Sequence, residues 1–180
     1  FLLFFLLLRA NAYITSWYVD GVHFTPETFP WKYYDSIHYG NPIVYPNGTA
    51  VCNKTDKHQE NIIYHAHENN VSVLWGGGLS VHDALFVDVG LQKNYLKTIG
   101  TASKECNIDG IEIDYEWGDT NWGEIGIVTP EQSTRYTSFL GDIKKATGGI
   151  VAADVSIWGI KKGLYPLGVL PWVNVSMLNA

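Results

Sequence analysis

With 180 residues, the chain has the length of one domain, and its 46% of apolar residues suffice for a buried core. The formal charge is −6 and the Lys and Arg residues form no stripe along the sequence. Nucleic acid is therefore not an expected partner, because phosphate binding needs a basic surface. The aromatic share of 14% can serve core packing or a sugar-binding cleft.

The first segment of the chain is almost wholly apolar over residues 1–8 and is followed by small residues at Ala10 and Ala12. It is too short to cross a bilayer as a helix, so no membrane partner is expected. We interpret residues 1–12 as the remnant of a secretory signal peptide, with a buried first strand or helix as the alternative. The expected location is therefore extracellular, or the lumen of the secretory or lysosomal pathway.

Other residues fit the same location. Sequons for N-glycosylation begin at Asn47, Asn53 and Asn70. Cys52 and Cys106 can form one disulfide in that compartment, or they can be two buried thiols. Their spacing does not resemble a metal site.

Short apolar segments alternate with amphipathic segments along the chain. Strands are predicted, in chain order, at residues 12–19, 36–45, 71–74, 108–117, 150–158 and 172–177. The second of these is interrupted by Gly40 and Pro42. Helices are predicted at residues 57–70 and 91–106, and from an N-cap at Thr129, with Pro130 in the first helical position, to about Gly148.

This alternation predicts a parallel sheet with helical crossovers. We expect an α/β fold, a (β/α)8 TIM-type barrel that is here incomplete with about six strands, because a whole barrel needs about 250 residues. An open doubly wound sheet is the alternative, but no Gly-rich phosphate loop follows the first strand.

The fourth predicted strand carries a row of acids. Side chains alternate along a strand, so Glu112, Asp114 and Glu116 point one way, and Ile111 and Ile113 point toward the covering helices. Carboxylates packed together cannot all ionise cheaply, which makes the row a functional candidate. Three interpretations are open: a solvated edge strand, a divalent-metal site, or acid catalysis on a glycosidic bond.

The segment Asp109-Gly110-Ile111-Glu112-Ile113-Asp114-Tyr115-Glu116 resembles the DGxDxDxE signature of glycoside hydrolase family 18, the chitinases and chitinase-like lectins. In that family the signature lies on the fourth barrel strand, as it does here. Residues 13–17, 73–77 and 173–177 resemble the first, third and sixth strands of the family. The resemblance implies a partial family 18 catalytic barrel over residues 13–180.

The resemblance also implies hydrolysis of β-1,4 N-acetylglucosamine linkages in chitin or chito-oligosaccharides by a retaining, substrate-assisted route. Glu116 would protonate the scissile oxygen. Asp114 would hold the substrate acetamido N–H, and Glu112 would share a proton with Asp114. No cofactor and no metal are expected.

Residues around the row have secondary roles. Asp109 lies on the opposite parity and is expected, with Gly110, to serve the structure where the strand starts. Trp117, Trp122 and Trp158 follow strand ends, where barrel sites form, and are candidates for sugar contact or for packing. The six His residues are scattered along the chain and are interpreted as structural.

The chain departs from the family pattern at three places. Glu112 replaces the middle Asp of the signature, Leu74 or Trp75 stands where a small polar residue is expected, and Leu178-Asn179 replaces a Tyr-Asp pair. These departures keep a second hypothesis open, a non-catalytic chitin-binding lectin or an inactive fragment. A metal-dependent barrel enzyme is the third.

Overall fold

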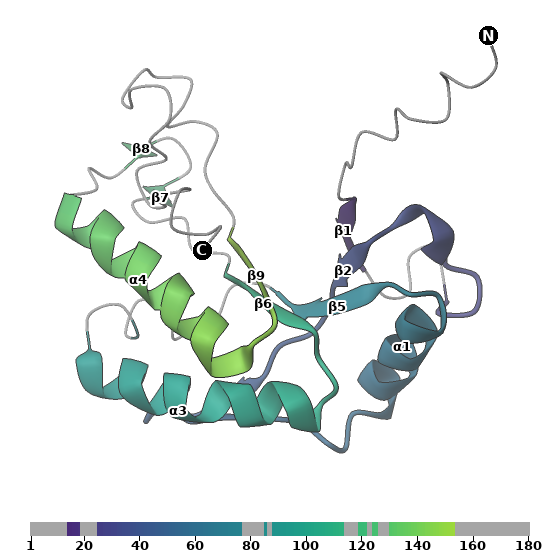
Figure 1. The fold of residues 1–180 in the computed structure, drawn as a ribbon, viewed down its shortest axis with the longest axis horizontal. Coiled ribbons are helices and arrows are strands. Elements are labelled where there is room, and N and C mark those ends of the chain that lie inside the picture. Colours follow the sequence, from purple (N-terminus) through teal and green to yellow (C-terminus); the bar gives the residue numbers. More distant parts are fainter. Residues whose placement is uncertain are drawn as a thin grey trace, which may run out of the picture.

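The fold is given by a computed structural model, shown in Figure 1. It describes residues 14–18, 25–76, 85, 88–113, 119–121, 124–125 and 130–153. The main sheet contains, in spatial order, β1 (Thr15–Trp17), β2 (Ser36–His38), β5 (Ser72–Trp75), β6 (Gly110–Ile113) and β9 (Ile150–Ala153). The helices are α1 (Lys57–Glu68), α3 (Val89–Glu105), α4 (Pro130–Thr147) and the 3-10 turn η1 (Trp31–Tyr33).

The order of the strands in the sheet decides between the two predicted fold classes. Every neighbouring pair is parallel, and the strands follow one another in chain order from β1 to β9. A doubly wound sheet reverses its strand order at a switch point, whereas a barrel does not. The prediction of an incomplete TIM-type barrel is confirmed as a parallel half-barrel of five strands. The predicted sixth strand, at residues 172–177, lies outside the described residues.

One face of the sheet is covered by helices. Ile37, Val73, Trp75, Ile111 and Ile113 each expose 2% or less of their surface and belong to one apolar core. The helices complete that core through the following residues: Ile62, Ile63, Ala66, Tyr95, Ile99, Ala102, Phe139, Leu140 and Ile143. Burying this apolar area is the main force that holds helices and sheet together.

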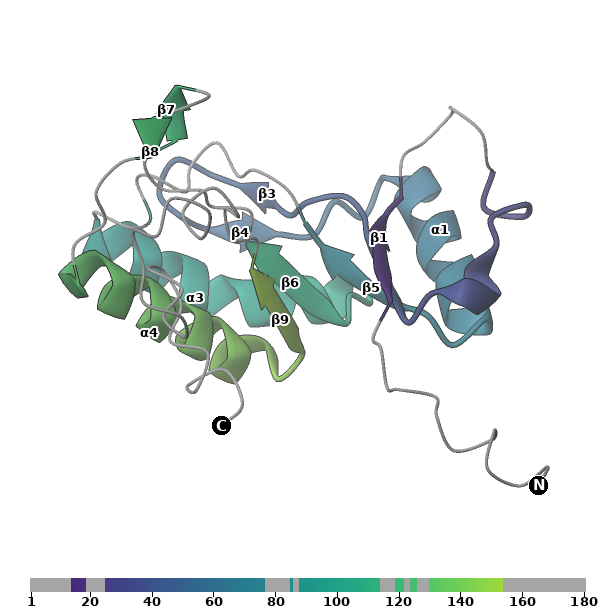
Figure 2. The ribbon, with the colours of Figure 1, turned by 90° about the horizontal axis from the view of Figure 1, so that it is seen from above.

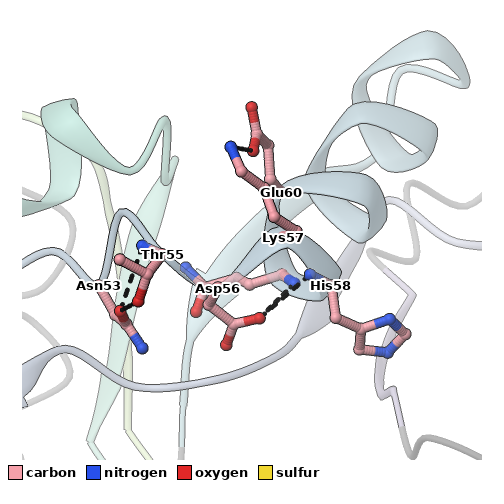
Figure 3. A network of polar contacts seen from close by, with 7 residues as sticks. Asn53, Thr55, Asp56, Lys57, His58 and Glu60 are labelled. Atoms are coloured by element: carbon pink, nitrogen blue, oxygen red, sulfur yellow. Dashed lines mark hydrogen bonds and ion pairs between the residues drawn. The ribbon is translucent and has the colours of Figure 1, made fainter.

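The helices begin and end where the local sequence provides caps. Asp56 accepts hydrogen bonds from the backbone N of His58 (3.1 Å) and of Gln59 (3.0 Å) at the start of α1, as Figure 3 shows. Lys57 adds an ion pair of 2.6 Å to Glu60 in the first turn. Helix α4 starts at Pro130, as predicted, and Thr129 lies outside the described residues.

The predicted interruption of the 36–45 segment at Gly40 and Pro42 is found in the structure. Strand β2 ends at His38, and Gly40 adopts a φ of +67°, which turns the chain out of the sheet. The chain then forms a separate antiparallel hairpin of β3 (Ile43–Val44) and β4 (Ala50–Val51). In Figure 2 this hairpin lies beside α3. A second small hairpin joins β7 (Asp119–Asn121) to β8 (Glu124–Ile125).

Cys52 and Cys106 form a disulfide with a Cα–Cα distance of 5.5 Å. It joins the segment that precedes α1 to the end of α3 across 54 residues of sequence. Of the sequon residues, Asn47 and Asn70 are exposed and Asn53 is half-buried. The Oδ1 atom of Asn53 accepts a hydrogen bond of 2.8 Å from the Thr55 hydroxyl, drawn in Figure 3. Residues 1–12 lie outside the described residues.

In the part of the chain that the structure describes, no helix is long and apolar enough to cross a bilayer.

We expect the disulfide to make a large contribution to stability. Closing a loop of 54 residues removes denatured-state entropy worth about 4 kcal/mol in the chain-entropy description. Thermal unfolding with and without a thiol reductant checks this. The double variant Cys52→Ala/Cys106→Ala is the control and should unfold at the same temperature in both buffers. Equal unfolding temperatures for the reduced and oxidised wild type would contradict the expectation.

Tyr95 provides a second prediction. Its ring is fully buried between α3 and α4, 5.9 Å from the Phe139 ring, and its hydroxyl has no hydrogen-bond partner among the described residues. Burial raises the pKa of Tyr95. Removing an unsatisfied buried hydroxyl in Tyr95→Phe should leave the free energy of unfolding unchanged or raise it by about 1–2 kcal/mol.

The same change has a pH signature. The folded state favours the neutral phenol of Tyr95. Its contribution to the free energy of unfolding is therefore present below the unfolded pKa of about 10 and is lost as the pH rises above that value. Tyr95→Phe should therefore lose less stability than the wild type between pH 9 and pH 11 in urea titrations. Tyr64→Phe, at a position that is 59% exposed, should follow the wild type.

Candidate functional site

The register of β6 places its side chains on two faces. Gly110 pairs with Leu74 of β5, Ile111 pairs with Trp75, and Glu112 pairs with Ala152 of β9. Paired residues of parallel strands share a face, and successive residues alternate faces. Since Ile111 and Ile113 contact the helices, Glu112 lies on the opposite, inner face of the half-barrel.

Glu112 is buried on that face, with 2% of its surface exposed. Its Oε2 atom lies 3.8 Å from Nδ1 of His38, the last residue of β2. The side chain of Glu112 is 0% exposed and that of His38 is 7% exposed. A carboxylate removed from water loses several kcal/mol of hydration unless a charged or hydrogen-bonding group offsets the loss. The imidazole of His38 lies beside this carboxylate, at a distance longer than a hydrogen bond.

Gly76 makes room for this pair. A Cβ atom built on Gly76 would lie 2.7 Å from Glu112 Oε2 and 3.1 Å from His38 Nδ1. Both distances are shorter than ordinary contacts of a methyl group, so a side chain at position 76 would push the two groups away. The glycine that follows β5 is therefore a packing requirement of the Glu112 site.

Asp109 and Gly110 hold the start of β6 in place. The Asp109 carboxylate accepts hydrogen bonds from Val73 N (2.8 Å) and contacts His67 Nε2 at 2.7 Å. The Asp109 backbone N donates to Val73 O at 2.9 Å. At Gly110, an added Cβ would collide with the backbone O of Ile150. These contacts join β6 to β5, to β9 and to α1.

The remaining predicted site residues cannot be placed against this geometry. Asp114, Glu116, Trp117, Trp122 and Trp158 lie outside the described residues, so their roles stay predictions. Conversely, the sequence interpretation of all His residues as structural misses the position of His38. Its only sequence signal is its place at the end of a predicted strand, where barrel sites form.

Part of the aromatic content serves packing near the ends of β1 and β2. The rings of Tyr18, Phe29 and Trp31 lie 4.5–5.9 Å from one another. Tyr39 contacts Tyr18 edge-on at 5.6 Å. The indole N of Trp31 donates to Pro26 O at 2.8 Å. These buried or half-buried rings form one aromatic cluster, so this part of the aromatic content is explained by packing.

A groove of about 750 Å³ lies elsewhere, on the helix side of the molecule. It is lined by α1 and by the chain on both sides of the disulfide, including Asn53, Tyr64, His67 and Asn107. None of its lining residues belongs to a strand, so it is separate from Glu112. Within the described ranges, no three His, Cys, Asp or Glu side chains gather as a metal site requires.

Replacing Gly76 by Ala should disturb the Glu112 site. We expect a loss of about 1–3 kcal/mol in the free energy of unfolding, the usual cost of overpacking. Gly141→Ala is the matched control, because an added Cβ at Gly141 in α4 meets nothing within 4 Å and alanine favours a helix. Urea unfolding should show the first variant weakened and the second unchanged or stabilised. Equal stability of both variants would mean that the space at Gly76 is not required.

No family model matches the sequence, and no curated protein matches it. Solved structures do share its fold. A chitinase from Bacteroides thetaiotaomicron aligns with a TM-score of 0.60 and 23% identity, over 81% of this chain and 47% of its own. The chitinase-like agglutinin RobpsCRA from Robinia pseudoacacia aligns with a TM-score of 0.55 and 12% identity, over 85% and 44%.

A GH18 chitinase from Cycas revoluta, solved in complex with (GlcNAc)3, aligns with a TM-score of 0.56 and 13% identity, over 79% of this chain and 45% of its own. The chain thus spans less than half the length of each of these structures. At such identities the likeness concerns the fold. The chain has the parallel half-barrel of the chitinase and chitinase-like (β/α)8 fold.

Proposed function

We propose that this chain carries the catalytic strand of a glycoside hydrolase family 18 domain that hydrolyses β-1,4 N-acetylglucosamine linkages in chitin or chito-oligosaccharides. One observation carries the proposal: Glu112 is buried on the inner face of β6, the fourth strand of the sheet. The signature-like row continues on the same parity to Asp114 and Glu116. The shared fold with chitinases supports it.

In the proposed mechanism, Glu116 gives its proton to the scissile glycosidic oxygen, and the leaving sugar departs as an alcohol. The carbonyl oxygen of the substrate N-acetyl group attacks the anomeric carbon and forms a cyclic oxazolinium ion. Asp114 holds the acetamido N–H and offsets the positive charge of that ion. Glu116, now a carboxylate, takes a proton from water, which opens the ring with retention.

The mechanism limits the substrate class. It requires an N-acetyl group at C2 of the sugar, which chitin has and cellulose lacks. A neighbour solved with (GlcNAc)3 supports the same ligand class for this chain. Trp117, Trp122 and Trp158 are proposed as sugar contacts, because they follow the strands at the end where barrel sites form.

We propose that the protein is exported, either outside the cell or to the lumen of the secretory or lysosomal pathway. The disulfide between Cys52 and Cys106 supports this location, since such bonds persist in oxidising compartments. Glycans are proposed at Asn47, Asn53 and Asn70 for the same reason. The apolar run at residues 1–8 fits an export signal.

A chitin-binding lectin is the second candidate. The chitinase-like agglutinin shares the fold, and Leu74, on the inner face opposite Gly110, offers no polar atom to a substrate. Leu178-Asn179 departs from the family pattern as well. Retention of Glu116 favours the enzyme, because a lectin has no need of a proton donor.

Glu116→Gln tests the proposed function. The protein expressed from its complete coding sequence should release fluorophore from a chitobiose substrate, and the variant should be slower by about 10²–10⁴-fold, the usual contribution of a general acid. Glu60→Gln, on the exposed side of α1, is the matched control and should keep the wild-type rate.

Other outcomes separate the rival functions. Binding of chito-oligosaccharides without turnover in the wild type would favour the lectin. Loss of turnover in EDTA would favour a metal-dependent enzyme. Equal rates for Glu116→Gln and the wild type would refute the role of Glu116.

A further inference from the structure

We propose that His38 is a positioning residue that acts through Glu112 and holds the carboxyl of that residue in one orientation. The role of His38 in catalysis rests on the proposed function above. The contact between His38 and Glu112 is a property of the fold and can be tested without turnover.

The pairing of the strands places His38 near Glu112. His38 pairs with Leu74, and Leu74 pairs with Gly110, so these three residues form one row across the inner face. Glu112 lies two residues further along β6, on the same face and in the next row. The imidazole of His38 therefore lies next to the carboxylate of Glu112, with 3.8 Å between Nδ1 and Oε2.

Hydrogen bonds on both sides fix the backbone at His38. The backbone O of His38 accepts a hydrogen bond from Tyr18 N at 3.0 Å, and the next residue, Tyr39, donates to Leu74 O at 2.9 Å. The end of β2 is thus fixed to its neighbours on both sides. A fixed backbone and a buried ring give His38 little freedom to leave Glu112.

The space between the two side chains depends on Gly76. Position 76 lies beside both side chains, and a Cβ atom there would lie too close to the carboxylate and to the imidazole. The sheet thus brings His38, Gly76 and Glu112 from three adjacent strands to one point of the inner face.

Glutamate has one more rotatable bond than aspartate, so a buried Glu112 needs a partner to select one orientation of its carboxyl. The imidazole ring, with its Nδ1 atom 3.8 Å from Oε2, occupies one side of the carboxyl and so restricts the orientations that the carboxyl can take. The carboxyl of Glu112 is then held in one orientation for the proton that it is proposed to share with Asp114.

Kinetics of three variants test the positioning role in the protein expressed from its complete coding sequence. His38→Leu keeps similar bulk without the ring nitrogens and should lower kcat on the chitobiose substrate by about 10- to 100-fold, the cost of a misplaced group. KM should change by less than about threefold, because His38 acts through Glu112 and not on the sugar.

His38→Asn places an amide N–H near the position of Nδ1 and should recover most of the lost kcat. His65→Asn, on α1, is the matched control and should behave as the wild type, since His65 contacts Glu27 at 3.5 Å and not the inner face. An unchanged kcat in His38→Leu, or no recovery in His38→Asn, overturns the proposal.

A stability cycle tests the pair independently of activity. His38→Leu removes the imidazole beside the buried Glu112 carboxylate, so it should lower the unfolding temperature more in the wild type than in a Glu112→Leu background. If Glu112→Leu does not fold, Glu112→Gln serves as the second background, because it also removes the charge. Additive shifts in unfolding temperature overturn the proposal.

The two arms separate the possible failures. If Glu116→Gln abolishes turnover and His38→Leu does not slow it, the proposed function stands and the positioning role falls. If the wild type shows no turnover, the proposed function falls, and the stability cycle alone decides whether His38 holds Glu112.

Discussion

The parallel register between β5, β6 and β9 is the constraint on which the candidate site depends. It places Ile111 and Ile113 against the helices and Glu112 on the inner face. A shift by one residue would exchange the two faces and drive a carboxylate into the apolar core, at a cost of several kcal/mol. Asp109 opposes such a shift, because its backbone and its carboxylate both bond to Val73.

The same register explains why two glycines accompany the acidic residue. Gly110 allows β9 to approach β6 closely, since a side chain there would meet Ile150. Gly76 allows the carboxylate of Glu112 to reach the ring of His38. In both cases the missing side chain is needed for space. The glycines and the acid therefore form one geometric unit, although they come from different strands.

Local patterns in the sequence predict most of the elements, and long-range contacts remain hidden from them. Helix periodicity and the preference of Pro130 for a first helical position locate the helices to within a few residues. Parity alone places Glu112 on the inner face. The contact of His38 with Glu112 spans 74 positions of sequence and depends on strand order, which no local pattern contains. The break after β2, by contrast, is predicted by the local sequence, because Gly40 forms the turn there.

The departures from the family 18 pattern can be understood together once the faces are known. Trp75 belongs to the helix-side core, so Leu74 is the residue that stands on the inner face where the pattern has a small polar group. Leu74 cannot bond to a carboxylate in the neighbouring row, and Gly110 cannot either. Among His38, Leu74 and Gly110, which pair across β2, β5 and β6, only His38 has a polar side chain. The imidazole lies 3.8 Å from the longer Glu112 side chain, so β2 and not Leu74 of β5 provides a polar neighbour for this acid.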